Sequence, residues 1–553
     1  MDRAADIEAP RTTMQDQRVS ESSSDSELPS PLEQHSTHPD AHASSSDHVS
    51  LAKTKSVAEQ MPLLKEIIFV GILCSAQITT QMSLNGTLAI LHVIGESLNI
   101  TNPGVLSWLI AGYSLTVGSF ILISGRFGDM FGYKIMIIIG FVWFGIWNIV
   151  CGCAVYSNEV LFIFGRVLSG IGPAILLPNA LGLLGATYGP GMRKNMIFSL
   201  FGACAPGGAI LGGVFAGVWN LIWWPWAFWT FAIATIILGI MAIFILPTIP
   251  LKPEVQNLTL KEKLVDLDPL GAGAFLTAAI LFNFAWNQAP GFGWQNAYIY
   301  VLLIIGILLF PVFFWIELRV ATKPLIPFDA LSTDVLFVLG CVACGWASFG
   351  IWLYYIFQFL EILRGHSPLL TIAQMTPVAV SGFAAAITTG KVIHRLGPGW
   401  VMFIAMCAFT IGNILLATTP IHQTYWAQIF VAVVVAPWGM DMSFPAGTLI
   451  LSNAVSKKHQ GVAASLVNTV VNYSISIGVG IAGTVEMQVS GGQTSTEATL
   501  KGYRGALYLA IGMSGFGMLL AMGFLAKKTL EGKKEGRGGE EDEKVPDPEK
   551  GQV

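Results

Sequence analysis

The chain has 553 residues, of which 53% are hydrophobic and only 12% are charged. Soluble globular proteins carry about 25% charged residues, so this composition indicates a protein that crosses a membrane many times. The formal net charge is -4, and the basic residues occur in short clusters between apolar stretches, which excludes a nucleic-acid-binding protein.

The first 60 residues are rich in Ser, Asp, Glu, His and Pro and show no apolar periodicity. Such a segment cannot bury a core, so we expect residues 1–60 to form a disordered cytoplasmic tail. The tail also lacks the basic segment and short apolar core of a cleavable signal peptide. We therefore expect the first hydrophobic helix to direct membrane insertion.

Apolar stretches long enough to cross about 30 Å of hydrocarbon as helices follow from there to the end of the chain. They predict an all-α integral membrane protein with 14 transmembrane helices. The first six are expected at 66–92, 105–124, 135–155, 160–183, 196–217 and 227–246. A cytoplasmic linker, 247–268, separates them from two helices within 269–317, at 269–287 and 297–317. The last six are expected within 334–526, at 334–360, 369–389, 400–418, 426–451, 461–485 and 505–526, before a disordered cytoplasmic tail at 527–553.

Basic residues are concentrated on one side of this arrangement. One set of connections carries Arg126, Lys134, Arg193, Lys194, Lys252, Lys261, Lys263, Arg319, Lys323, Lys391, Arg395, Lys457 and Lys458, and the other carries Arg364, Lys501 and Arg504. Cytoplasmic loops are enriched in Lys and Arg, so both termini are expected in the cytoplasm. We expect the protein to lie in the plasma membrane, with the vacuolar membrane as the alternative. Asn99 begins a weak glycosylation signal in the first outer loop.

The two groups of six helices are related by an internal repeat. Shifting the chain by 265 to 267 residues aligns the run from Gly125 to Lys134 with the run from Gly390 to Gly399, and also aligns Pro178 with Pro445. Parallel repeats of six helices are one way in which secondary transporters build a site near the middle of the membrane. The helices at 269–317 then form an insertion between two halves.

The run from Gly125 to Lys134 resembles the cytoplasmic loop signature of the major facilitator superfamily. The layout of 14 spans resembles the fungal drug:proton antiporter branch of that family, and the resemblance covers roughly residues 65–527. It implies a major facilitator fold, with two six-helix bundles and two extra helices between them. The branch includes proteins linked to aminotriazole and boron resistance and to low-affinity ammonium transport, which the resemblance implies as substrate types.

The loop and its copy are expected to act as a conformational latch. The expected latch residues are Gly125, Gly128, Asp129, Gly132 and Lys134, with Gly390 and Gly397 in the copy. Glycines at these spacings leave a surface that another helix can approach closely, and a carboxylate can lie against a helix N-terminus. The alternative is a tight solvated turn. Met130 and Tyr133 stand where the family has basic residues, so we expect fewer charged interactions in this loop than the family usually has. His394 replaces the aspartate in the copy, which restricts the acidic latch to the first half.

Span four contains Arg166, in a run that resembles the second signature of the family. An arginine near the middle of a membrane helix costs about 2.5 to 3.5 kcal/mol on insertion scales, so it should face a wet cavity or a partner. We expect a role in handling protons or substrate. The alternative is an arginine that only ties helices together through carbonyl groups.

In span five, Gly208, Gly212 and Gly213 form a helix-packing signature that resembles the one associated with antiporters. Ala209 stands where that signature has proline, and Pro206 is expected to supply the kink instead. Despite this departure, the resemblance favours export over import.

Asp441 is interpreted as the only acidic residue deep within a span. It lies about 15 residues after Trp426, and at about 1.5 Å per residue this places it past the middle of the membrane. Carboxylates in such positions are usually proton or cation sites, and the alternative is a structural acid bonded to Ser or Asn. Two stripes of amides are expected to line the substrate and proton pathway with Asp441 and Arg166. They are Gln77, Gln81 and Asn85 in span one and Asn468 and Asn472 in span thirteen. Bonding between helices is the competing use of these amides.

The sequence lacks the motifs that would indicate other protein classes. The seven cysteines lie in apolar stretches, where a thiol packs as a small hydrophobic group, so we expect no disulfide framework, no metal site and no cofactor. The chain has no phosphate-binding motif of an ATP-driven pump and no nucleophile with a base, so we expect no enzyme.

The leading hypothesis is therefore a secondary active transporter that exports a small polar or weakly basic compound in exchange for protons. Its expected partners are the small-molecule substrate, protons and the lipid bilayer, and we expect a monomer. One alternative is facilitated uptake of a small cation or neutral nutrient such as ammonium. Another, of a different class, is a sensor that binds solute without moving it.

Overall fold

The computed structural model describes residues 61–189, 192–251, 253–321, 323–326, 332–454 and 460–542. Within these residues all regular elements are helices, and they form 14 segments that are long and apolar enough to cross a membrane. The expected all-α class and the number of spans are thus confirmed. The tail expected at 1–60 and the last residues, 543–553, lie outside the described residues.

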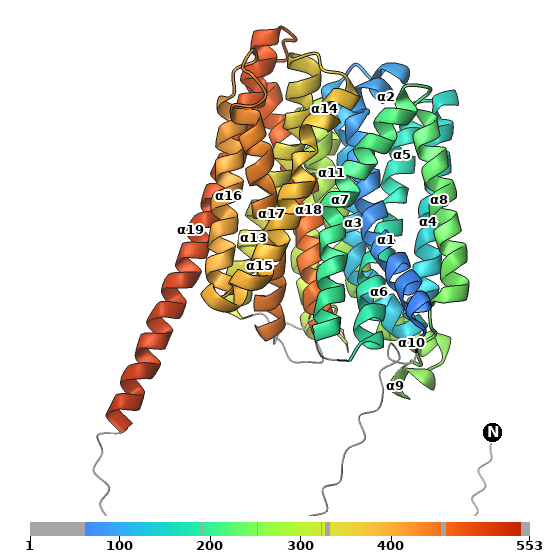
Figure 1. Cartoon of the computed structure of the whole chain (residues 1–553), viewed down its shortest axis with the longest axis vertical. Coiled ribbons are helices and arrows are strands. Elements are labelled where there is room, and N and C mark those ends of the chain that lie inside the picture. The colour runs from blue at the N-terminus through green and yellow to red at the C-terminus, as the bar shows by residue number, and fades with distance from the viewer. Residues whose placement is uncertain are drawn as a thin grey trace, which may run out of the picture. The chain divides into compact units, whose positions relative to one another are not determined.

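The helices of the first half run in the order expected from the sequence (Figure 1). They are α1 (Leu63–Ala89), α2 (Leu91–Ser97), α3 (Pro103–Phe131), α4 (Tyr133–Cys153), η2 (Ala154–Tyr156), α5 (Glu159–Ser169), α6 (Ile171–Thr187), α7 (Met192–Asn220) and α8 (Pro225–Ile245). The fourth span consists of α5 and α6 together, separated at Gly170.

The linker and the insertion follow. The linker contains the short helices α9 (Pro253–Gln256) and α10 (Leu260–Asp266), and the inserted pair is α11 (Pro269–Phe292) and α12 (Ala297–Arg319). Thr259 caps α10, because its side chain accepts from the backbone N–H of Glu262 while the Glu262 carboxylate accepts from the backbone of Thr259.

The second half contains six more spans. They are formed by α13 (Thr333–Gln358) with η4 (Phe359–Leu363), α14 (Pro368–Met375) with α15 (Pro377–Leu396), α16 (Pro398–Thr418), α17 (Gln428–Ala454), α18 (Gln460–Ser490) and α19 (Thr496–Asp542). Helix α19 continues beyond 526, so residues 527–542 are helical where the sequence predicted a disordered tail.

Each half is a bundle, and the two bundles meet along two seams. In the first bundle α1 packs on α7, and α4 packs on α6 and α8. In the second, α16 packs on α17 and α19, and α13 packs on α18 and α19. Helix α3 lies against α18 at one seam, and α7 lies against α14 and α15 at the other. The inserted α11 contacts both α3 and α18, so the insertion covers the first of these seams.

The internal repeat is visible in the backbone at the two loop signatures. Helix α3 ends at Gly132, which has φ 98° and ψ 132°, and α15 ends at Gly397, which has φ 81° and ψ 156°. These residues are 265 positions apart in the chain, the offset of the sequence repeat. Because side chains disfavour positive φ, glycine is what allows both helices to stop and reverse in the same way.

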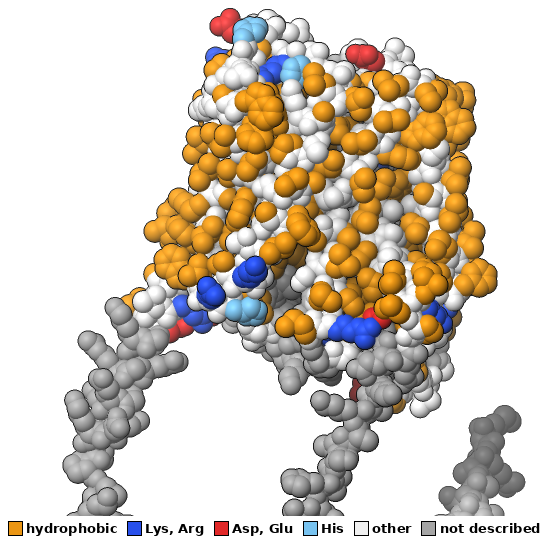
Figure 2. Space-filling model, in the orientation of Figure 1, with side chains coloured by type: hydrophobic (Ala, Val, Ile, Leu, Met, Phe, Trp, Pro, Cys, Tyr) orange, Lys and Arg blue, Asp and Glu red, His pale blue; other side chains and the backbone are white. Residues whose placement is uncertain are grey.

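The two ends of the bundle differ in composition. The connections α3–α4, α6–α7 and α15–α16 lie at one end, which we call the basic end because it carries Arg126, Lys134, Arg193, Lys391 and Arg395. The opposite end, with Trp219, Trp223, Trp226, Trp294 and Tyr298, is called the aromatic end. Figure 2 shows hydrophobic side chains over the flank between the ends, with blue basic groups along its lower edge. Such a flank is suited to contact with lipid.

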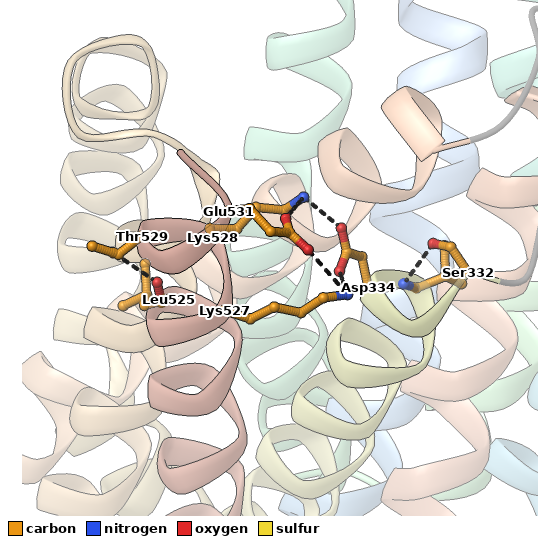
Figure 3. Close-up of polar contacts among 8 residues, drawn as sticks. Ser332, Asp334, Leu525, Lys527, Lys528, Thr529 and Glu531 are labelled. Atoms are coloured by element: carbon orange, nitrogen blue, oxygen red, sulfur yellow. Dashed lines mark hydrogen bonds and ion pairs between the residues drawn. The ribbon is translucent and has the colours of Figure 1, made fainter. Parts of the chain in front are cut away.

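A group of charges joins the last span to the second bundle at the basic end (Figure 3). Asp334, in the first turn of α13, accepts from Lys527 Nζ at 2.6 Å and pairs with Lys528 Nζ at 2.7 Å. Lys528 also lies 3.1 Å from Glu531 on the same helix. The carboxylate of Asp334 therefore holds α19 against the start of α13.

Candidate functional site

Asp441 lies on α17 where the two halves meet. Two prolines, Pro437 and Pro445, occur inside α17 on either side of it. A Cβ atom added to Gly382 of α15 would lie 2.9 Å from Asp441 Oδ2 and 2.9 Å from the Pro206 ring of α7. The glycine thus gives the carboxylate room beside a helix of the first half.

The Oδ2 atom of Asp441 is buried and has no hydrogen-bond partner within the described part of the chain. A buried carboxylate oxygen without a donor is unfavourable, because water no longer solvates it. The structural alternative, a carboxylate satisfied by neighbouring Ser or Asn groups, has no support at this atom. A proton would neutralise the charge of this carboxylate, and a bound ligand with an N–H or O–H group would supply the missing hydrogen bond.

The seam next to Asp441 is tight towards the aromatic end. There, Gly213 and Gly217 of α7 pack against Ile372 and Leu369 of α14. At the basic end, Figure 2 shows the surface hollowed at the lower edge between the halves.

Arg166 is fully buried inside the first bundle. Its guanidinium group donates to Ser83 Oγ at 2.8 Å and to the backbone oxygen of Leu109 at 3.1 Å. It also lies 4.4 Å above the ring of Tyr113. These contacts tie α5 to α1 and α3, as in the alternative interpretation from the sequence, and the structure does not bring Arg166 into contact with Asp441.

The burial of the amide stripe on α1 increases along the helix from Gln77 to Asn85. Gln77 and Gln81 are half-buried, whereas Asn85 is buried and donates to the backbone oxygen of Gln81 at 3.3 Å. The stripe on α18 is half-buried as well, and Asn472 donates to the backbone oxygen of Asn468 at 3.0 Å. Both asparagine bonds stay within their own helices, so neither ties one helix to another.

The glycine signature of α7 lies in helix contacts. A Cβ atom at Gly208 would lie 2.7 Å from the backbone oxygen of Ile78, and Gly212 lies directly against Met82 of α1. Gly213 faces the other way, against Ile372 of α14. One short stretch of α7 thus packs on its own bundle and on the opposite one.

At the loop signature, Gly128 lies against Asn179 of α6, and Gly125 lies beside Pro178 and beside Ser465 of the other half. Asp129 accepts a hydrogen bond from the Tyr133 hydroxyl at 2.6 Å, so the tyrosine that replaces a basic residue is a partner of the acid. Lys134 is half-buried, and added Cβ atoms at Gly390 and Gly397 would meet nothing within 4 Å.

Arg126 of the same loop binds the insertion. Its guanidinium group donates to the backbone oxygens of Lys323 and Pro324, in the segment that follows α12. The sequence had placed this arginine only in the cytoplasmic charge bias. Its actual role could not be inferred, because the partners are backbone atoms far away in the chain.

A second acidic residue inside a span was missed. Helix α18 extends to Ser490, beyond the expected end at 485, and this extension brings Glu486 into the protein. Glu486 accepts a hydrogen bond from the Tyr355 hydroxyl at 2.7 Å. Glu486 is half-buried and lies one turn before the end of α18, so the interpretation of Asp441 as the only acid deep within a span stays a prediction. The signal was an apolar period that continues through Val489, one turn past the glutamate.

Comparisons with known proteins agree with this architecture. The model of the Major Facilitator Superfamily matches residues 73–399 and 335–548. A low affinity ammonium transporter of Saccharomyces cerevisiae is 53% identical over 474 residues, which cover 85% of this chain and 91% of that protein. The efflux pump terJ of Aspergillus terreus is 45% identical over 470 residues, covering 85% and 89% of the two chains. The aminotriazole resistance protein of S. cerevisiae is 37% identical over 477 residues, covering 85% and 86%.

Among solved structures, the peptide transporter POT in complex with sulfate superposes with a TM-score of 0.61. The sequence identity is 16%, and the alignment covers 84% of this chain and 95% of that one. At this identity the likeness concerns the fold alone.

Proposed function

The chain belongs to the Major Facilitator Superfamily and is a multi-pass membrane transporter of small molecules, and we propose that it exports a small polar or weakly basic compound in exchange for protons. The observation that carries this proposal is the Asp441 carboxylate beside the opposite half, which has a buried oxygen without a hydrogen-bond donor among the residues that the structure describes. Coupled exchange needs one group that binds a proton in one conformation and releases it in another.

In the proposed cycle, the basic end faces the cytoplasm, in accordance with the concentration of Lys and Arg there. A substrate enters between α7 and α15 and meets Asp441 together with the half-buried amides Gln77 and Gln81. Binding displaces the proton from the carboxylate. The halves then rock, the site opens at the aromatic end, and a proton from outside restores the protonated carboxyl group.

Arg166 has a different part in this proposal. Its bonds to Ser83 and Leu109 keep a positive charge fixed within the first bundle. A fixed positive charge disfavours a second cation nearby, so we propose that protonated substrate binds on the side of Asp441. We further propose that the protein works as a monomer, since one chain contains both halves of the pathway, and that it resides in the plasma membrane.

Uptake of ammonium is the second candidate, and one observation favours it. The relative that is 53% identical is named a low affinity ammonium transporter, whereas relatives at 45% and 37% are named for efflux and for aminotriazole resistance. The two candidates predict opposite signs in growth tests. Export raises tolerance of a toxic solute on overexpression, and uptake lowers tolerance of toxic methylammonium.

The test uses sealed membrane vesicles that contain the full chain, with an imposed pH gradient and radiolabelled aminotriazole or methylammonium as probes. Gradient-driven movement of aminotriazole by the wild type and its loss in Asp441→Asn would support the proposal. Glu96→Gln is the matched control, because Glu96 is an exposed carboxylate at the aromatic end. If transport by Asp441→Asn still depended on the pH gradient as in the wild type, Asp441 would not be the group that couples transport to protons. Methylammonium uptake without any aminotriazole movement would favour the second candidate.

A further inference from the structure

A small crevice lies at the aromatic end of the seam between α3 and α18. Helices of both halves and of the insertion contribute to it. It is lined by Gly104, Ser107, Pro290, Tyr354, Tyr355, Val479, Gly483, Glu486 and Met487. Its enclosed space admits a particle of about the size of one water molecule. The crevice is separate from Asp441, which lies on the other seam, beside α7 and α15.

Glu486 is the charged group among these lining residues. Its carboxylate accepts a hydrogen bond from the Tyr355 hydroxyl, a neutral donor, at 2.7 Å, and no ion pair to Glu486 occurs among the described residues. A carboxylate held inside a protein without a basic partner is costly, because neither water nor an opposite charge compensates it. The crevice therefore favours a positively charged occupant.

Three tyrosine rings cluster beside the crevice, and two of these residues, Tyr354 and Tyr355, line it. The rings of Tyr354 and Tyr355 have centroids 5.2 Å apart, and those of Tyr355 and Tyr503 are 5.3 Å apart. All three residues are at most 6% exposed. Aromatic faces attract cations, and most strongly those that are already weakly hydrated or desolvated. The lining offers one carboxylate and few further oxygen atoms, whereas Ca²⁺ takes about six to eight oxygen ligands, so the surroundings favour a monovalent cation with N–H donors over Ca²⁺.

We propose that the crevice at Glu486 binds a small monovalent cation with N–H donors, of the size of ammonium. The carboxylate accepts from the cation, Tyr354 and Tyr355 face it, and the hydroxyl oxygen of Ser107 on α3 serves as a further acceptor. Because the lining comes from both halves, the cation bridges α3 and α18 at this end. The inference goes beyond the exchange proposed at Asp441 and does not depend on it.

The experiment measures thermal unfolding of the purified full-length protein in detergent, against increasing ammonium chloride at fixed ionic strength set with choline chloride. Ammonium should raise the unfolding temperature of the wild type with saturation. In Glu486→Gln the half-saturating concentration should rise by at least about tenfold, as expected when a charged hydrogen bond is lost. The amide oxygen can still accept from Tyr355, so the variant keeps the contact that positions α13.

Three further variants serve as controls for this experiment. Glu497→Gln, an exposed carboxylate at the same end, should respond to ammonium as the wild type does. Asp441→Asn should also keep the response, so that failure of this site and failure of the proposed exchange are distinguishable. Tyr355→Phe removes the hydroxyl and retains the ring, and it should weaken the response less than Glu486→Gln. Equal stabilisation by potassium chloride, or an unchanged half-saturating concentration in Glu486→Gln, would overturn the proposal.

Discussion

Ser476 of α18 donates its hydroxyl hydrogen towards the backbone oxygen of Ala111 on α3, at 2.9 Å, and so links the two halves inside the membrane-spanning region. The same hydroxyl lies 2.9 Å from Asn283 Oδ1 of the insertion, and Asn287 Nδ2 lies 3.3 Å from the Ser476 backbone oxygen. The side chains of Ser476, Asn283 and Asn287 are fully buried. The inserted helix α11 thus shares a polar contact with both halves at this seam.

Removal of this contact should destabilise the protein. Ser476→Ala removes the hydroxyl donor that links Ala111 of α3 and Asn283 of the insertion to α18, and hydrogen bonds between membrane helices contribute about 0.6 kcal/mol on average and up to about 1.7 kcal/mol. We expect a lower unfolding temperature in detergent. Ser514→Ala is the matched control, because Ser514 is equally buried but donates only to backbone oxygens of its own helix. An equal effect of the two substitutions would show that Ser476 has no special role at the seam.

The glycines at the ends of α3 and α15 should not tolerate side chains. Gly132→Ala and Gly397→Ala place a Cβ atom at φ 98° and φ 81°, which should cost about 1 to 2 kcal/mol each. Gly390→Ala, inside α15 with open space around it, should be neutral or stabilise by about 0.5 to 1 kcal/mol. Chemical unfolding of the three variants checks this. The expectation fails if Gly390→Ala is the most damaging.

A methyl group at Gly382 should disturb the site more than the fold. In Gly382→Ala the added carbon would lie 2.9 Å from Asp441 Oδ2 and from the Pro206 ring, so the carboxylate or α7 must shift. Overpacking of this kind costs about 1 to 3 kcal/mol. We expect aminotriazole movement in vesicles to fall by at least about tenfold while the protein still inserts and purifies. Wild-type transport rates would contradict this placement of Gly382.

The charge group in Figure 3 should contribute modestly to the stability of the protein, and this contribution should decrease as the salt concentration rises. Asp334→Asn removes the shared partner of Lys527 and Lys528, so it should lower the unfolding temperature more than Lys527→Met or Lys528→Met alone. Since these charges are partly exposed, added salt should shrink the difference from the wild type. Unfolding measured at low and high sodium chloride tests the point. A difference that does not change with salt would argue against an electrostatic role.

Asn99 offers a test of the proposed orientation. It is exposed in the connection before α3, at the aromatic end, and begins a glycosylation signal. If that end faces outward, the protein from a fungal host should shift in electrophoretic mobility on treatment with a glycosidase, and Asn99→Gln should abolish the shift. Modification of a signal introduced at the basic end instead would reverse the orientation.

The sequence by itself determined the membrane class, the 14 spans and the two related halves, because these depend on local hydrophobicity and on an offset that can be counted along the chain. It also singled out Asp441, since a carboxylate inside an apolar stretch is conspicuous without any knowledge of its neighbours. The helix ends were less well determined, and Glu486 lies among the five residues by which the end of α18, at Ser490, exceeds the expected end at 485.

Only the tertiary structure decided what surrounds each candidate. Arg166 and Asp441 are equally unusual in the sequence, yet one is enclosed by Ser83, Leu109 and Tyr113 and the other stands beside the opposite half. The same holds for the inserted helices, whose place over the α3–α18 seam depends on contacts such as that of Asn287 with Ser476, which are 189 residues apart in the chain. Hydrophobicity determines that a segment enters the membrane, whereas the fit of side chains between helices determines which segments meet there, and only the meeting of segments creates a site.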